Sequence, residues 1–61
     1  MKKTNVVLAV RDIDLRLSLD LMLRDELNLN VLGTATTLES TLGLIRAERP
    51  DIVLLEWSLC S

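Results

Sequence analysis

The sequence predicts an α/β fold, a three-layer βαβαβ unit in which helices cover a parallel sheet. Three short, continuously apolar runs have the character of buried strands, and the two longer segments between them have the length and composition of helices. Because the two kinds of element alternate and the connections are short, a parallel sheet with right-handed crossovers is favoured. The whole chain, 1–61, is one small domain.

The first two elements are a strand over 5–10 and a helix over 12–27. After Asn5, the run NVVLAV is continuously apolar and contains three valines, which is typical of a central parallel strand covered on both faces. The stretch DIDLRLSLDLMLRDEL alternates apolar and polar residues from Ile13 to Leu23, apart from Met22, as a half-buried strand also does. Its apolar residues are mostly leucine and it is too long for a typical strand, so we predict a helix.

On a helix, this alternation becomes two apolar stripes. The first stripe, expected to pack on the sheet, consists of Leu15, Leu19, Met22 and Leu23. The second and narrower stripe consists of Ile13, Leu17 and Leu21. An uncovered aliphatic stripe usually marks an interaction surface, so we favour a partner on the second stripe over partial exposure in a monomer.

The remaining elements are a strand over 29–35, a helix ending near Glu48, and a strand over 52–55. Thr36 and Glu39 form a capping-box signature, which predicts Thr36 as the N-cap of this helix. The inward face of the helix is predicted to be Leu38, Leu42 and Ile45. Pro50 ends the helix, and the buried run IVLL then leads to Glu56.

Composition excludes several classes of function. The chain has no histidine and a single cysteine, Cys60, so an internal disulfide is excluded and a zinc site is implausible. The net charge is −2 and no basic run is present, which argues against nucleic-acid binding by this segment. No apolar run approaches the ~20 residues of a membrane span, so we expect a cytoplasmic protein. A chain of this size buries only about 60% of its unfolded surface, so we expect oligomerisation or a longer parent chain.

These segments resemble the N-terminal half of a response-regulator receiver domain of two-component signalling. NVVLAVRD stands where the family has an apolar strand ending in two acidic residues, and VLGTATTLESTLGLIRAERPDIVLLEWSL resembles its second strand, second helix and third strand. The resemblance implies half of a flavodoxin-like fold with strand order 2-1-3. It also implies that Glu56 occupies the position of the phosphoacceptor aspartate, and that Arg11 and Asp12 occupy the positions of the acidic pair that binds Mg²⁺.

The sequence departs from the family at these same positions. Glu56 is one methylene longer than aspartate, and Arg11 puts a positive charge where a dication would lie. Leu59-Cys60 replaces the usual Met-Pro, and the later Ser/Thr and Lys of the family have no counterpart in these residues. The resemblance therefore implies a degenerate pseudo-receiver that is not an enzyme, needs no cofactor, and binds Mg²⁺ weakly or not at all.

The candidate site residues allow more than one interpretation. Glu56 could imitate a phosphoaspartate as a fixed charge, but we favour a structural strand-end acid that forms an ion pair with Arg11. Trp57 is equally an interface anchor or a loop residue packed on the end of the sheet. Cys60 could be a reactive or intermolecular thiol, although an incidental cysteine is the simpler interpretation.

The third strand adds a second candidate interface. In a 2-1-3 sheet, the residues Ile52, Val53, Leu54 and Leu55 form an open apolar edge, which invites pairing with another chain. Antiparallel pairing of two copies would give a six-stranded sheet with two-fold symmetry. We therefore predict a homodimer through this edge and the exposed helix face, with other signalling proteins as further partners.

Two functions remain open at this point. The first is a regulatory protein-interaction module, a truncated and phosphorylation-independent pseudo-receiver that acts through dimerisation. The alternative is the N-terminal fragment of a longer response regulator that retains phosphoacceptor activity and carries an output domain, often DNA-binding in this family. An acyl-phosphate donor with Mg²⁺ would modify only the second.

Overall fold

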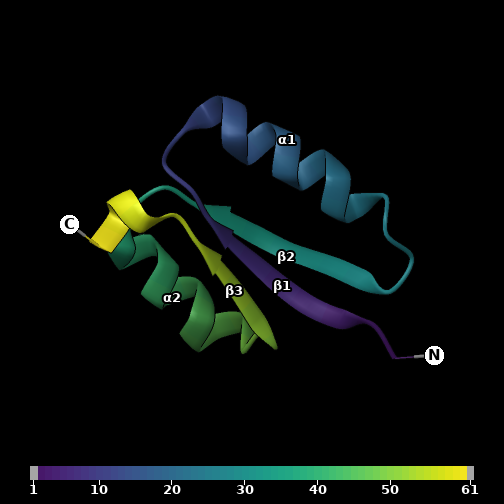
Figure 1. Ribbon diagram of the computed structural model, residues 1–61. Coiled ribbons are helices and arrows are strands. Elements are labelled where there is room, and N and C mark those ends of the chain that lie inside the picture. Colours follow the sequence, from purple (N-terminus) through teal and green to yellow (C-terminus); the bar gives the residue numbers. More distant parts are fainter. Residues whose placement is uncertain (1, 61) are drawn as a thin grey trace.

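The protein is a single layer of three parallel strands between two helices, as a computed structural model of the chain shows (Figure 1). The structure describes residues 2–60, without the side chain of Cys60. The predictions made for the Cys60 thiol therefore lie outside the described residues. The elements are β1 (Thr4–Ala9), α1 (Ile13–Arg24), β2 (Leu29–Ala35), α2 (Leu38–Glu48), β3 (Ile52–Leu55) and a 3₁₀ turn, η1 (Trp57–Cys60). The predicted α/β class and the parallel β2-β1-β3 order are confirmed.

The core is centred on β1, the middle strand of the sheet. Val6, Val7, Leu8, Ala9 and Val10 are all buried, because β1 is paired on both edges and covered on both faces. Neighbouring side chains of a strand point to opposite faces, so Val7 and Ala9 face one helical layer while Val6, Leu8 and Val10 face the other. This accounts for an apolar run without alternation in β1.

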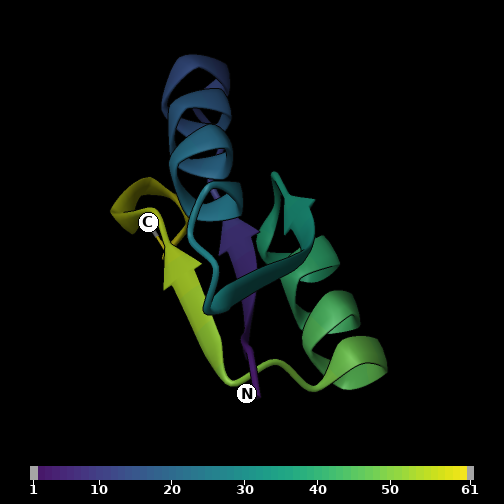
Figure 2. The same ribbon diagram turned by 90° about the vertical axis from the view of Figure 1, so that its right-hand side faces the viewer.

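Helix α1 packs over β2, and α2 lies on the opposite face against β1 and β2 (Figures 1 and 2). Asp12 is the N-cap of α1, with its carboxylate accepting the Leu15 N–H at 3.1 Å. The helix ends at Arg24, three residues earlier than predicted, because the Glu26 N–H bonds to the Leu23 carbonyl at 3.1 Å in a tighter turn than that of an α-helix.

The first stripe of α1 is only partly covered. Leu19 and Leu23 are half-buried against the sheet, whereas Leu15 and Met22 are exposed, contrary to the predicted packing of all four residues. The reason is the position of α1: since it lies over β2, the described residues leave the side of the helix that faces β3 largely uncovered.

The prediction for α2 is wrong in its N-cap and in most of its inward face. Thr37, one residue later than predicted, is the N-cap and accepts the Ser40 N–H at 3.0 Å. Leu38 and Leu42 are 47% and 44% exposed, while Thr41 is buried with its hydroxyl bonded to the Thr37 carbonyl at 2.7 Å.

Helix α2 packs on the sheet close to Gly33 of β2. Gly33 of β2 has no side chain, and a methyl group there would lie 3.4 Å from the nearest methyl carbon of Leu44. The helix approaches the sheet through Thr41, Leu44 and Ile45, and Leu38 and Leu42 are turned outward.

Candidate functional site

The candidate site lies at the carboxyl ends of β1 and β3, which are neighbours in the sheet. Ala9 pairs with Leu55, and the Glu56 N–H donates to the Ala9 carbonyl at 2.9 Å. Glu56 is thereby held beside the loop that joins β1 to α1. The three positions singled out in the sequence, Arg11, Asp12 and Glu56, do come together here.

Glu56 binds this loop through its main chain. One carboxylate oxygen, Oε1, accepts the backbone N–H of Arg11 at 2.6 Å and that of Asp12 at 3.1 Å. These are charge-assisted hydrogen bonds at the start of α1, where the helix dipole also favours a negative charge. Glu56 therefore connects the end of β3 to the start of α1.

The same contacts shift the acidity of Glu56. The backbone N–H of Asp12 is the largest influence, and with the N–H of Arg11 and the side chain of Ser58 it lowers the pKa of the Glu56 carboxyl below its ordinary value. Partial desolvation and the nearby Asp12 carboxylate oppose this shift. Glu56 is consequently ionised at neutral pH, and its negative charge is stabilised by the two backbone amides.

The predicted ion pair between Arg11 and Glu56 is not formed. Arg11 contacts Glu56 through its backbone nitrogen, and its side chain is exposed. The ion pair found within residues 2–60 joins Arg24 to Asp20 along α1, at 2.6 Å. The Arg11 and Asp12 amides are already fixed by the start of α1, so their bonds to Glu56 cost little conformational entropy. An ion pair with the Arg11 guanidinium would also have to order a long, flexible side chain.

The donor groups at this edge do not fit a magnesium ion. The carboxylate of Asp12 caps α1, that of Glu56 accepts two amides, and Arg11 adds a positive charge. Among the described residues, no group of three or more Asp, Glu, His or Cys side chains is arranged to hold a metal.

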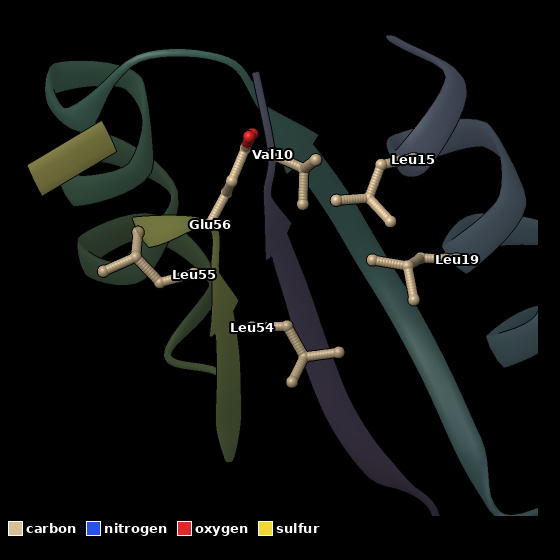
Figure 3. Close-up of a pocket in the computed structure, with 6 residues that line it drawn as sticks. All are labelled: Val10, Leu15, Leu19, Leu54, Leu55 and Glu56. Atoms are coloured by element: carbon tan, nitrogen blue, oxygen red, sulfur yellow. The ribbon is translucent and has the colours of Figure 1, made fainter. Parts of the chain in front are cut away.

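A groove separates α1 from β3 on one face of the sheet (Figure 3). Its volume is about 260 Å³, and it is lined by Val10, Leu15, Leu19, Leu54, Leu55 and Glu56. Leu15 and Leu19 of α1 and Leu54 of β3 point toward one another across it, while Leu55 points away from α1 (Figure 3). The groove is apolar except for Glu56 at its end.

The predicted interface residues are largely exposed. In the second stripe of α1, Ile13, Leu17 and Leu21 are 60%, 54% and 73% exposed. In β3, Ile52, Leu54 and Leu55 are exposed and Val53 is half-buried. Trp57, at 85% exposure, does not pack on the end of the sheet.

Sequence reasoning missed two features of this site. The role of Asp12 as N-cap was signalled by an aspartate directly before the first apolar residue of a helix. The hydrogen bond from the Ser58 side chain to Glu56 had no such signal, because it depends on the turn η1 after β3.

Comparison of the chain with protein-family models, with curated proteins and with solved structures finds no match. Within residues 2–60, neither helix has the length and apolar character needed to span a membrane.

Proposed function

We propose that this chain is a phosphorylation-independent pseudo-receiver, a regulatory interaction module of the two-component type. The observation that carries the proposal is the binding of the Glu56 carboxylate to two backbone amides, at the sheet position where the resemblance expects a phosphoacceptor. The 2-1-3 order of the parallel strands also supports it.

The bound state of Glu56 argues against phosphoryl transfer. The two N–H donors stabilise the charge of the Glu56 carboxylate, which makes it a weaker nucleophile than a free carboxylate. Phosphoryl transfer also depends on a cation that neutralises the developing charge, and Asp12 and Glu56 are engaged elsewhere. A fixed carboxylate that connects β3 to α1 instead stabilises one conformation of this edge.

In this proposal the module acts through self-association and through contacts with other signalling proteins. The open edge of β3 supports this role. Since the Glu56 N–H bonds to β1, and alternate residues of a strand bond to the same neighbour, Val53 and Leu55 direct their backbone groups outward. The proposal includes a cytoplasmic location and no catalytic or nucleic-acid-binding activity.

Treatment with acetyl phosphate and Mg²⁺, followed by intact mass spectrometry, tests this function. We expect no phosphoryl adduct on the wild-type chain. The double variant Arg11→Asp/Glu56→Asp restores acids that the resemblance expects, and Glu56→Gln reports any nonspecific reaction. An adduct on Glu56 of the wild type, lost in Glu56→Gln, would overturn the proposal in favour of a phosphoacceptor that acts within a longer regulator.

A further inference from the structure

We propose that two copies of this chain stack face to face, with α1 of each copy filling the groove beside β3 of the other. This inference rests on the self-association in the proposed function and specifies its geometry. Its partner is a second copy of the same chain, and its contact surface is the second stripe of α1, that is Ile13, Leu17 and Leu21.

One face of the sheet is only half covered by the residues that the structure describes. Helix α1 covers β2 on this face, and an apolar groove lined by Leu15, Leu19 and Leu54 lies beside it over β3. Ile52 is on the same face as Leu54 and is also exposed. Packed helices lie about 8–10 Å apart, so a second helix beside α1 would lie over this strip.

Helix α1 is itself apolar on two sides. At about 100° per residue, the centres of its two apolar stripes are about 170° apart around the helix. Of the first stripe, Leu19 and Leu23 face the sheet of their own chain. The centre of the second stripe is about 140° around the helix from these two residues, so the second stripe points largely away from that sheet. Two opposite apolar faces are expected of a helix that lies between two sheets.

In one symmetric arrangement, the second stripe of α1 from each copy fills the groove beside β3 of the other copy. A two-fold axis that runs between the two α1 helices, and nearly parallel to them, places each helix beside the other in one shared layer. Each helix then covers β2 of its own chain and β3 of its partner, and Leu15 and Met22 face the neighbouring helix. The contact is isologous and closes on itself as a dimer.

The polar residues of α1 are compatible with this layer. Between the two stripes, on the side toward β3, lie Asp14, Ser18 and Asp25. Ser18 is small and occupies the middle of the helix. Asp14 and Asp25 are at its two ends, where their carboxylates reach solvent.

The exposed area matches the size of such an interface. The chain exposes 4512 Å², whereas a folded monomer of this mass exposes about 4,000 Å². The excess is about 500 Å² a copy, or about 1,000 Å² for a pair, which reaches the area that a specific interface requires. Pairing of the four-residue strand β3 alone would leave the second stripe of α1 in water.

Light scattering after size-exclusion chromatography, over a concentration series, tests the stacking with matched variants. Leu17→Gln/Leu21→Gln removes two exposed leucines from the second stripe, and Leu38→Gln/Leu42→Gln removes two with the same spacing from α2 on the other face. Glutamine has nearly the helix propensity of leucine, so circular dichroism should show that both variants fold. Val53→Pro removes an outward N–H from the β3 edge.

We expect Leu17→Gln/Leu21→Gln to weaken the dimer at least about a hundredfold, while the α2 variant and Val53→Pro remain dimeric. The reverse result, in which only Val53→Pro is monomeric, would overturn the stacking and retain self-association through the strand edge. A wild-type chain that is folded and monomeric at every concentration would overturn both.

Thiol cross-linking gives a readout that does not depend on weakening the dimer. Leu17→Cys and Leu54→Cys, each made with Cys60→Ser, are mixed and treated with a short bismaleimide. Stacking brings the two positions together across the interface, so the mixture should give the Leu17–Leu54 heterodimer, identified by its cross-linked peptides after digestion with trypsin. If the mixture yields no more heterodimer than a Leu42→Cys and Leu54→Cys mixture, the stacking is wrong.

Discussion

Arg49 is the residue whose backbone conformation offers the sharpest test of the structure. It is the C-cap of α2 and adopts the left-handed conformation, with φ 48° and ψ 60°, while its N–H bonds to the Ile45 carbonyl at 2.9 Å. It is the non-glycine residue with positive φ in the described part of the chain. Replacing Arg49 by glycine should therefore stabilise the protein.

The expected gain follows from two opposing effects. The left-handed conformation costs an L-residue about 1–2 kcal/mol, and glycine avoids that cost. Glycine also loses about 0.5–1 kcal/mol more conformational entropy on folding. The net gain is about 0.5–1 kcal/mol, which corresponds to a rise in Tm of roughly 4–8 °C for a domain of this size.

Urea denaturation followed by circular dichroism measures this difference at one fixed protein concentration. Arg49→Ala is the matched control, because it removes the exposed side chain but keeps the β-carbon that causes the strain. We expect the alanine variant to differ from wild type by only a few tenths of a kcal/mol. If Arg49→Gly is no more stable than Arg49→Ala, the left-handed cap between α2 and β3 is incorrect.

Two further predictions address the site and the second helix. The contact of Glu56 with the Arg11 and Asp12 amides lowers its pKa, so the stability it contributes is present above the ordinary glutamate pKa and is lost as pH falls through the lowered value. Glu56→Gln should remove that part of the acid dependence in denaturation experiments over an acidic pH series, and an unchanged profile would contradict the contact. Thr37→Ala should cost about 1 kcal/mol of unfolding free energy through loss of the α2 cap, whereas Thr36→Ala should cost clearly less. Equal costs in urea denaturation would show that the cap is misassigned.

The strands were the most predictable elements. The observed β2 and β3 agree with the predicted 29–35 and 52–55, and β1 differs from 5–10 by one residue at each end. The reason is physical: a parallel strand covered on both faces requires an uninterrupted apolar run, and Pro50 prevents the preceding helix from continuing into β3. Such signals are local and need no knowledge of the fold.

The faces of the helices were less predictable. Periodicity shows that α1 has two apolar stripes, but it does not say how far each is covered. That depends on the position of α1 over β2 and on the close approach of α2 at Gly33, which turns Thr41 inward and Leu42 outward. Both depend on contacts between segments far apart in the sequence.

The candidate site was also predictable only in part from the sequence. Arg11, Asp12 and Glu56 follow the ends of apolar runs, and parallel strands bring such ends to one edge of the sheet, so the sequence alone determined that these residues meet. Only the tertiary structure decided that Glu56 binds the amides of Arg11 and Asp12 rather than the Arg11 guanidinium. Which donors reach a carboxylate depends on the start of α1 and on the strand register, to within an ångström, and no residue pattern encodes that distance.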